Sequence, residues 1–395
     1  MRERMLFLSA QSHYPEDIEG EIRTENFLDI LLQRFDIDLL EYCHCRKDLP
    51  AQPRPELTVH RVKRAMAPRR PMLVPLNKLR SYSPLVRTDK TLRAELTEKC
   101  RLNAYTHVFI SYCMLGNCLD VVASLLPEAV IITDAHRYGS RTLESRTAGK
   151  RGISNGYHKL GAALMRREER RLMNKTSLLL TATEWDALSF KAVSFADAGK
   201  VHVVPPYINL NEPKYNAAEI APRDHSVVLH WNMHTSQGKS AALLFLKKVY
   251  PLVKAAVPDF VCRIISDKVH PEIAALAGPD AAIELVAGAG QTAEYIRRAS
   301  AVVTSLRDGC GGVIKILEAW ALRTPVVCGP RGAEDLICEP GRDILLAGTT
   351  AGFADELVKL LMAPELGSII ADQAYRTLEK HYSADGVKEK VLSLV

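Results

Sequence analysis

Residues 301–321 read AVVTSLRDGCGGVIKILEAWA, which joins a short apolar run, a glycine-rich turn and a helical pattern. The run over Ala301–Ser305 is typical of a buried strand. From Val313 onward, apolar residues recur at helical spacing, which predicts an amphipathic helix. The intervening glycines leave room for a ligand beside the backbone. Because a helix N-terminus carries unpaired N–H groups and partial positive charge, this stretch is predicted to bind an anion.

Lys315 and Glu318 lie on the predicted helix, three residues apart and on nearly the same face. A lysine in the first turn opposes the helix dipole at a cost of about 0.3 kcal/mol. A phosphate bound at that end would make the contribution of the lysine favourable. A carboxylate at position 318 can accept hydrogen bonds from a ribose. The alternative is a surface ion pair that contributes about 0.3 kcal/mol. The residue pattern by itself leaves both interpretations open.

Length and composition indicate a globular protein of two domains. The chain has 395 residues, of which 47% are hydrophobic and 25% charged. No apolar stretch approaches 18 residues and no signal peptide is recognisable, so we expect neither a membrane span nor export. The nine cysteines show no spaced framework, and Cys43-His44-Cys45 lacks a second pair of ligands. We therefore expect a reducing, cytoplasmic location and no bound metal.

The net charge of +6 is unevenly distributed. Ten lysines and arginines lie between Arg61 and Arg93 against a single acidic residue, Asp89. Such a field favours an anionic partner. The apolar residues within the same run, Met72 and Leu73 among them, suggest a segment that contacts an acceptor or the inner face of an anionic membrane. Nucleic acid is not expected as a partner, because aromatic residues are not interleaved with the basic ones.

Strands and helices are predicted to alternate along the whole chain, which is typical of parallel, doubly wound sheets. In the first half, the predicted strands are Met5–Ala10, Ile37–Tyr42, Leu57–Val62, Thr106–Ser111, Ala129–Thr133, Ser177–Ala182 and Val201–Pro205. In the second half, they are Ser226–His230, Val261–Ile265, Ile283–Val286, Ala301–Ser305 and Pro325–Cys328. Pro205-Pro206 and the polar stretch Asn209–Asp224 are predicted to form an interdomain linker.

We therefore predict an α/β architecture of two Rossmann-like domains that face a central cleft. The first domain covers residues 1–207 and the second covers residues 208–381. A C-terminal helix over about residues 382–395 is expected to pack back on the first domain. Ligands of such sheets bind beyond the carboxyl ends of the strands, where both glycine-containing loops are predicted.

The chain resembles the family-4 glycosyltransferases of the GT-B fold. The resemblance rests first on Gly309-x-Gly311-x-x-x-Lys315-x-x-Glu318-Ala319, followed by Thr324-Pro325-Val326-Val327. The strand end Thr133-Asp134-Ala135-His136 is similar to the family's Asp-x-His segment. Glu169 ahead of a strand, Val203-Val204-Pro205 at the domain joint and Gly288 ahead of Tyr295-Ile296 also fit the pattern.

This resemblance implies the transfer of a sugar from a nucleotide diphosphate sugar to a glycan, lipid-linked or small-molecule acceptor, with retention of configuration and without a metal. It names His136, Lys315 and Glu318 as catalytic candidates. Glu318 would hold the ribose, Lys315 would neutralise phosphate charge, and His136 would approach the donor sugar from the first domain. The donor-binding candidates are Gly20, Gly288, Gly309, Gly311 and Gly312, with backbone amides of the last two on the diphosphate or sugar.

Several positions depart from the family pattern. The glutamate usual eight residues before the ribose-binding one is Cys310, and Asp308 lies near enough to substitute for it. Where the family has a glycine followed by basic residues, this chain has Trp231 and Asn232. The further donor-binding candidates are Asn232, Lys239, Arg307 and Asp308. We interpret Trp231 as a core residue.

The sequence thus predicts a glycosyltransferase of polysaccharide or glycoconjugate biosynthesis. A sugar-nucleotide epimerase or phosphorylase on the same fold remains an alternative. A third reading is a GT-B adaptor protein that has lost catalysis along with the first glutamate. Nucleotide-dependent stabilisation would separate the enzymes from the adaptor.

Overall fold

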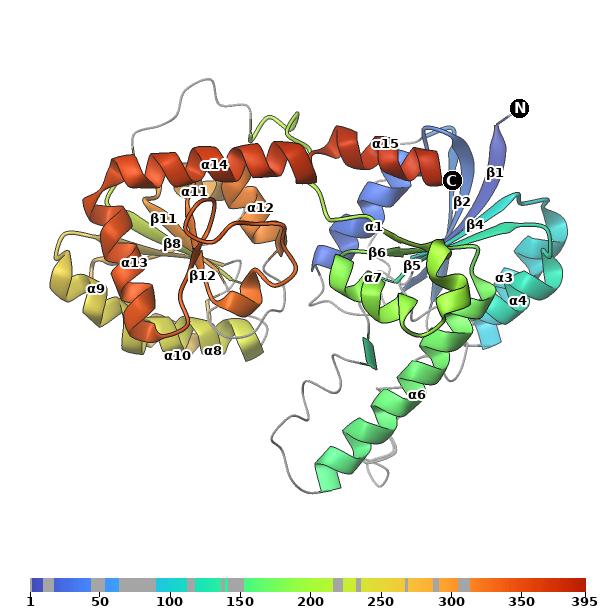
Figure 1. Ribbon diagram of the computed structural model, residues 1–395, viewed down its shortest axis with the longest axis horizontal. Helices are drawn as coiled ribbons and strands as arrows, with labels where there is room; N and C mark the ends of the chain where they lie inside the picture. Colours follow the sequence, from blue (N-terminus) through green and yellow to red (C-terminus); the bar gives the residue numbers. More distant parts are fainter. Residues whose placement is uncertain are drawn as a thin grey trace. The chain divides into compact units, whose positions relative to one another are not determined.

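The computed structural model describes residues 2–9, 18–43, 54–63, 90–111, 118–135, 139–140, 153–215, 223–231, 236–266, 269–286, 291–304 and 313–395. The chain divides into two compact units. Unit 1 comprises Met1–Pro205 together with Val391–Val395, and unit 2 comprises Pro206–Lys390. Each unit is a parallel β-sheet in which helices join most successive strands (Figure 1).

Unit 1 contains a seven-stranded sheet in the order β3-β2-β1-β4-β5-β6-β7. Its strands are β1 (Glu3–Ser9), β2 (Phe35–Cys43), β3 (Leu57–Lys63), β4 (His107–Ser111), β5 (Val130–Asp134), β6 (Leu178–Thr181) and β7 (Val201–Val203). All neighbouring strands run parallel. The order reverses between β1 and β4, which is the switch point where such sheets bind ligands.

Helices cover both faces of the unit 1 sheet. They are α1 (Ile18–Leu31), α3 (Lys90–Leu102), α4 (Leu119–Leu125), α6 (Ile153–Lys175) and α7 (Glu184–Lys191). Helix α1 packs on one face, where the ring of Phe27 lies 5.1 Å from that of Phe109. The alternate residues Val108 and Ile110 face the other side and join a core with α3, α4, α6 and α7. Because side chains alternate across a strand, apolar residues in succession mark a sheet that is buried on both faces.

Unit 2 contains a six-stranded sheet in the order β10-β9-β8-β11-β12-β13. Its strands are β8 (Ser226–His230), β9 (Val261–Ile265), β10 (Ile283–Val286), β11 (Ala301–Val303), β12 (Val326–Cys328) and β13 (Leu345–Leu346), and all pairs are parallel. The order reverses between β8 and β11, so the loops that follow these two strands flank the switch point.

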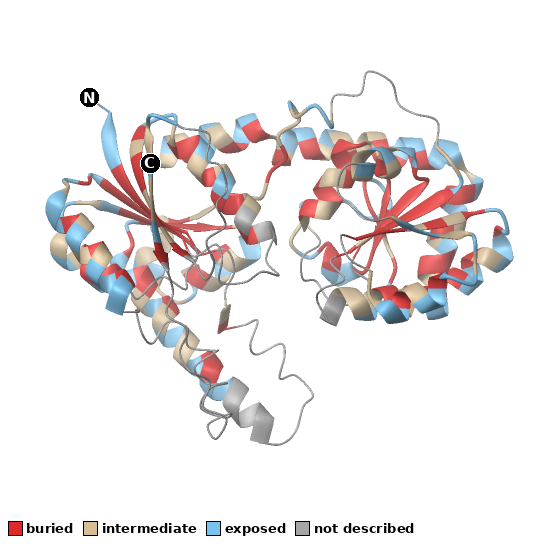
Figure 2. Cartoon of the chain, turned by 180° about the vertical axis from the view of Figure 1, so that it is seen from behind, coloured by how far each residue is buried: buried red, intermediate tan, exposed pale blue. Residues whose placement is uncertain are grey.

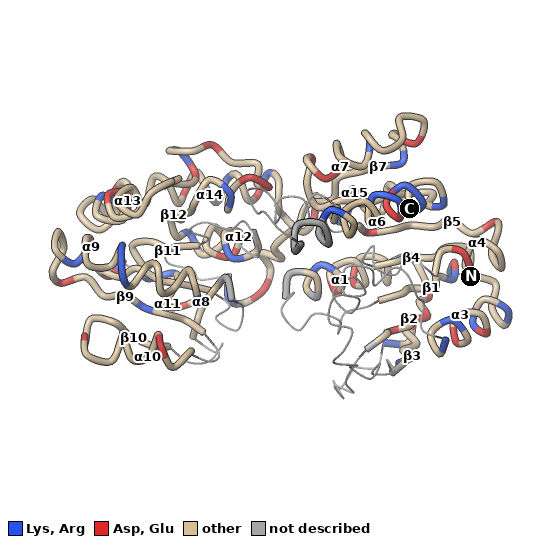
Figure 3. The backbone as a smooth tube through the Cα atoms, turned by 90° about the horizontal axis from the view of Figure 1, so that it is seen from below, with Lys and Arg blue, Asp and Glu red and all other residues tan. Residues whose placement is uncertain are grey.

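Two helical layers enclose the unit 2 sheet, and its central strands β8, β11 and β12 are almost wholly buried (Figure 2). Val227 and Leu229 face a core built with α8 (Ser236–Leu244), α9 (Tyr250–Ala256), α10 (Pro271–Ala277) and α13 (Thr350–Met362). Val228 faces the opposite core, built with α11 (Thr292–Arg298), α12 (Val313–Ala321) and α14 (Pro364–Tyr382). The chain ends in α15 (Ala384–Leu394). Charged residues lie mostly on the helices, and β11 and β12 carry none (Figure 3).

The structure confirms the predicted doubly wound architecture, with local differences. The helical pattern of residues 241–253 is interrupted by a π-helical turn over Phe245–Val249 between α8 and α9. Pro251 in the first turn of α9 explains the interruption, because proline donates no N–H and its ring clashes with the carbonyl four residues earlier. The short strand β13 and the helices α3, α7, α10 and α11 were not predicted.

Residues 209–215 of the predicted linker are not a free connection. Leu210 and Tyr215 pack against the α12–α14 core of unit 2, and Ile208 is buried in it. The Ile208 N–H donates to the carbonyl of Tyr382 at 3.0 Å. This part of the linker prediction is therefore wrong, because the polar residues 209, 211 and 212 alternate with apolar ones that reach the core.

Candidate functional site

Helix α12 begins at Val313, beyond the loop that follows β11 at the switch point of unit 2. Its inner residues, Ile316, Leu317 and Trp320, are fully buried and fix the rotation of the helix. That rotation leaves Lys315 and Glu318 half-buried, one helical turn apart on the outer face. The predicted pair therefore lies on the rim of the unit 2 sheet, at the place where ligands bind in such folds.

The carboxylate of Glu318 lies in a largely enclosed position, with its side chain 25% exposed. Burial raises the pKa of Glu318, and the positive charges of Lys214 and Lys315 oppose this shift. Lys214 Nζ lies 3.8 Å from Glu318 Oε1. The same surroundings raise the pKa of Tyr215, mainly by burial and then through the negative charge of Glu318. Sequence analysis missed Lys214 and Tyr215, because 104 residues separate Lys214 from Glu318 and no motif connects them.

His230 ends β8 beside α12. Strand alternation places His230 on the same side as Val228, which is the α12 face of the sheet. Burial, and then the charge of Lys315, lower the pKa of His230 to about 3, so its imidazole is neutral at physiological pH. Its Nδ1 atom is enclosed and has no hydrogen-bond partner among the described residues. A neutral imidazole next to a lysine at a helix N-terminus can donate a hydrogen bond to an anion.

The next residue, Trp231, points to the opposite core. It is 6% exposed, and its ring packs at 6.2 Å from that of Phe245. The interpretation of Trp231 as a core residue is therefore confirmed. Its bulk stands where the resemblance expects a glycine.

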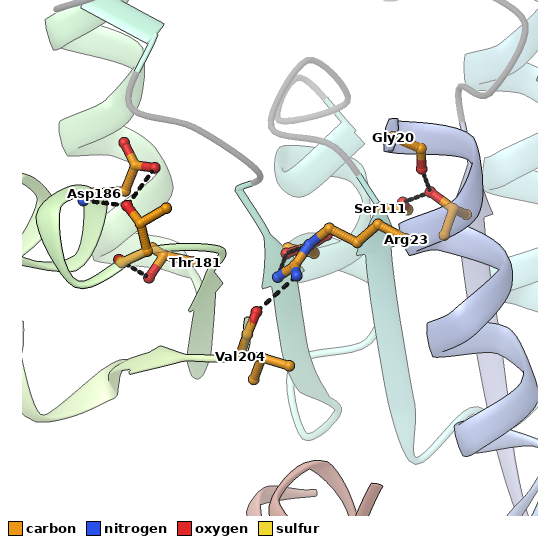
Figure 4. Close-up of polar contacts among 9 residues, drawn as sticks. Gly20, Arg23, Ser111, Thr181, Asp186 and Val204 are labelled. Atoms are coloured by element: carbon orange, nitrogen blue, oxygen red, sulfur yellow. Dashed lines mark hydrogen bonds and ion pairs between the residues drawn. The ribbon is translucent and has the colours of Figure 1, made fainter. Parts of the chain in front are cut away.

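In unit 1, Gly20 lies within the first turn of α1 and is buried. Its carbonyl accepts a hydrogen bond from Thr24 Oγ1 at 2.8 Å, and Thr24 Oγ1 lies 2.6 Å from Ser111 Oγ at the end of β4. The start of α1 is thereby attached to the switch point of the unit 1 sheet (Figure 4).

Arg23 forms the main polar contact of this edge, and sequence analysis missed it. Its Nε donates to both carboxylate oxygens of Asp134 at 3.1 and 3.0 Å, and its Nη2 donates to Oδ1 at 2.8 Å. Its Nη1 donates to the carbonyl of Val204 at 2.7 Å (Figure 4). The Arg23 side chain is 8% exposed and that of Asp134 is not exposed at all. One guanidinium therefore joins α1, the end of β5 and the residue after β7, and its carboxylate partner is the aspartate of the Asp-x-His segment.

A second buried acid holds the residues that follow that segment. Glu169, on α6, is 4% exposed, and its Oε1 accepts a hydrogen bond from the backbone N–H of Ser140 at 2.9 Å. A Cβ at Gly139 would lie 2.7 Å from the methyl carbon of Met165, so only glycine fits there without a shift of Met165. Glu169 thus fixes the backbone at Ser140 from α6.

Comparison with known proteins gives a family for part of unit 2. Residues 224–363, which include α12, match the family model described as glycosyl transferases group 1. No curated protein sequence matches the chain.

Solved structures match the whole chain. HepE from Anabaena in complex with UDP has 12% sequence identity, covers 99% of this chain and 98% of its own, and superposes with a TM-score of 0.67. Sucrose-phosphate synthase from Thermosynechococcus elongatus has 13% identity, 100% and 98% coverage and a TM-score of 0.68. A variant of TarM from S. aureus in complex with UDP has 10% identity, 100% and 99% coverage and a TM-score of 0.64. These similarities show that the fold is GT-B.

Within unit 2, Lys239 does not join Lys315 and Glu318. It lies in the first turn of α8, and its Nζ forms an ion pair with Glu272 of α10 at 3.1 Å. This contact, which lowers the pKa of Glu272, gives Lys239 a role in joining two helices on the α8–α10 side.

Eight predicted residues lie outside the described residues, and their roles stay predictions: His136, Asn232, Gly288, Arg307, Asp308, Gly309, Gly311 and Gly312. Most of the basic run between Arg61 and Arg93 also lies outside them. Among the described residues, no group of three or more His, Cys, Asp and Glu side chains is arranged to hold a metal ion. No helix in the described part of the chain is long and apolar enough to cross a bilayer.

Proposed function

We propose that the protein transfers a sugar from a nucleotide diphosphate sugar to a glycan, lipid-linked or small-molecule acceptor, with retention of configuration. One observation carries the proposal: Lys315 and Glu318 lie one turn apart on α12, at the switch point of a sheet whose sequence matches a glycosyltransferase family. HepE and TarM, which share the fold, were solved with UDP, which supports a nucleotide as the ligand.

Each residue of the site has a distinct task in this proposal. Glu318 accepts hydrogen bonds from ribose hydroxyls. Lys315, the N-terminus of α12 and the amides of Gly311 and Gly312 stabilise the negative charge that develops on the diphosphate as the sugar leaves. The neutral imidazole of His230 lies beside Lys315 and donates to the same phosphates. His136 approaches the donor sugar, and the leaving phosphate assists removal of the acceptor proton.

The remaining parts of the proposal concern the surroundings of the enzyme. The reaction uses no metal, because fixed cations and amide dipoles take over charge stabilisation. The basic run between Arg61 and Arg93 brings a cytoplasmic enzyme to the inner face of an anionic membrane, where lipid-linked acceptors and their products lie. Binding to anionic vesicles that weakens as salt rises would support this part.

The test combines binding and transfer. UDP, GDP, dTDP and ADP are screened by thermal denaturation, and the proposal expects at least one to raise the melting temperature of the protein. Glu318→Ala should then weaken transfer from the corresponding nucleotide sugar by about 10- to 100-fold, because charged hydrogen bonds to ribose are lost. Lys359→Ala is the matched control, since Lys359 forms an exposed pair with Glu356 on α13.

Two results would contradict the proposal. A protein stabilised by none of the four nucleotides is expected of a binding adaptor. Turnover of the nucleotide sugar alone, or only with free phosphate, is expected of an epimerase or a phosphorylase.

A further inference from the structure

We infer that Lys214 is a positioning residue of the nucleotide site, which holds the carboxylate of Glu318 in place as an ionised acceptor for ribose hydroxyls. The inference rests on the proposed function and assigns a task to a residue outside the family match, which begins at residue 224. It therefore brings the segment after the first unit into the donor site.

The backbone around Lys214 is fixed at several points. The N–H of Tyr215 donates to the carbonyl of Glu212 at 2.9 Å, which closes a turn. Arg297 on α11 donates from Nη2 to the carbonyl of Lys214 at 2.6 Å. Arg297 is itself held by an ion pair with Glu294 at 2.7 Å. Lys214 is thus presented by an anchored turn.

The side chain of Lys214 is held as well. Its Nζ lies over the ring of Tyr215, 4.8 Å from the centroid, and Tyr215 packs against the α12–α14 core. The same Nζ lies 3.1 Å from Glu212 Oε2 and 3.8 Å from Glu318 Oε1. The lysine is 45% exposed, so its charge stays hydrated while one of its contacts reaches the more enclosed carboxylate.

The charges around Glu318 explain why such a cation is needed. Burial disfavours the ionised carboxylate, and the nearby Glu212 disfavours it further. Only Lys214 and Lys315 act in the opposite direction among the groups that shift the pKa of Glu318. In the proposed function, Lys315 faces phosphate, so Lys214 is the cation that stays with the carboxylate when a nucleotide binds. Without Lys214, the pKa of Glu318 rises further, and the carboxylate protonates at a higher pH.

The alternative is that Lys214 competes with the ribose for Glu318. The two roles predict opposite effects of Lys214 on the affinity for the nucleotide. A positioning lysine strengthens nucleotide binding, most strongly at low pH, whereas a competing lysine weakens it at every pH.

The experiment measures the dissociation constant of whichever of UDP, GDP, dTDP and ADP binds best, from about pH 5.5 to about pH 8 by calorimetry. Wild type is compared with Lys214→Met, which keeps the apolar stem over Tyr215, and with Lys214→Arg, which keeps the charge. Lys359→Met serves as the matched control, since Lys359 lies 2.8 Å from Glu356 on α13. Glu318→Gln and its double variant with Lys214→Met complete a cycle. The terminal phosphate of the nucleotide also titrates in this pH range. Its effect on binding is the same for all variants, so the variants are compared with one another at each pH.

Lys214→Met should weaken binding by about threefold near pH 8 and by about tenfold near pH 6, while Lys214→Arg and Lys359→Met stay close to wild type. In the Glu318→Gln background, Lys214→Met should have no further effect. The loss should also shrink for the 2′,3′-dideoxy form of the nucleotide, which has no hydroxyls to donate.

Three outcomes would overturn the inference. If wild type binds a nucleotide and Lys214→Met binds it equally well or more tightly, Lys214 is not a positioning residue, while the proposed function stands. If Lys214→Met weakens nucleotide binding equally in the wild-type and Glu318→Gln backgrounds, Lys214 contacts the nucleotide directly or is a structural residue. If wild type binds none of the four nucleotides, the proposed function fails and the role of Lys214 falls with it.

Discussion

At the scale of single residues, each unit contains an enclosed carboxylate that is paired with a cation far away in the sequence. Asp134 is fully buried and its contact with Arg23 spans 111 residues of sequence, and Glu318 is held by Lys214 from 104 residues away. Sequence analysis named Asp134 and Glu318 from their motifs. It could not name the two partners, because sequence spacing carries no information about contacts that the fold makes across a sheet.

The buried pair of Arg23 and Asp134 leads to a prediction about the stability of unit 1. Arg23→Met should lower the free energy of unfolding by about 3–5 kcal/mol, because Asp134 would keep a buried charge without its guanidinium. Arg23→Met combined with Asp134→Leu should recover most of that loss, since an apolar pair of similar volume is tolerated. Urea unfolding followed by circular dichroism measures both variants. A double variant as unstable as the single one would show that the carbonyl of Val204, rather than Asp134, needs the arginine.

At the scale of elements, most strands were predictable and several helices were not. Strands β8, β9 and β10 begin and end at the predicted residues, because both faces of each sheet are covered and polar residues flank the apolar runs. Helices α7, α10 and α11 have eight, seven and seven residues, which is too short for a clear helical period. For α7, a signal was present in Thr183-Glu184-Trp185-Asp186, where the threonine precedes an acidic first turn.

That N-terminal cap of α7 can be tested directly. Thr183 Oγ1 accepts a hydrogen bond from the N–H of Asp186 at 3.0 Å. Thr183→Ala should therefore destabilise α7 by about 1 kcal/mol and speed exchange of its amide hydrogens. Ser189→Ala is the matched control on the same helix, since Ser189 donates to the carbonyl of Trp185 and caps nothing. Equal exchange in the two variants would contradict the capping role.

At the scale of the whole molecule, the GT-B fold joins two sheets of similar topology that carry different parts of the proposed chemistry. The predicted acceptor-side residue, His136, belongs to unit 1, and Lys315 and Glu318 belong to unit 2. The alternation of strands and helices predicted this duplication, and the resemblance supplied the division of labour between the units. The roles predicted for Gly288, Gly309, Gly311 and Gly312, by contrast, depend on backbone geometry, which residue types do not specify.

This division predicts a localised response to a nucleotide. At a concentration about 100 times the dissociation constant, UDP or the preferred nucleotide should stabilise the folded state that binds it by about 2.7 kcal/mol. The increase in protection from hydrogen exchange should appear in α12 and residues 206–215 of unit 2, and it should be small in the sheet of unit 1. Glu318→Ala serves as the control, because an affinity that is about 10- to 100-fold weaker at the same nucleotide concentration should reduce the stabilisation to about 0.4–1.4 kcal/mol. Equal protection of both units would contradict a donor site confined to unit 2.

The discontinuous course of the chain has a practical consequence. Unit 1 takes Val391–Val395 from the far end of the sequence, and Arg34 on the turn after α1 donates to the carbonyl of Val395. A fragment that ends at Pro205 would therefore lack residues 391–395 of unit 1. The complementary fragment, which begins at Pro206, would carry these mostly apolar residues without the unit that they belong to. A stable isolated unit 1 would require residues 391–395 to be joined to it again, for instance by circular permutation of the gene.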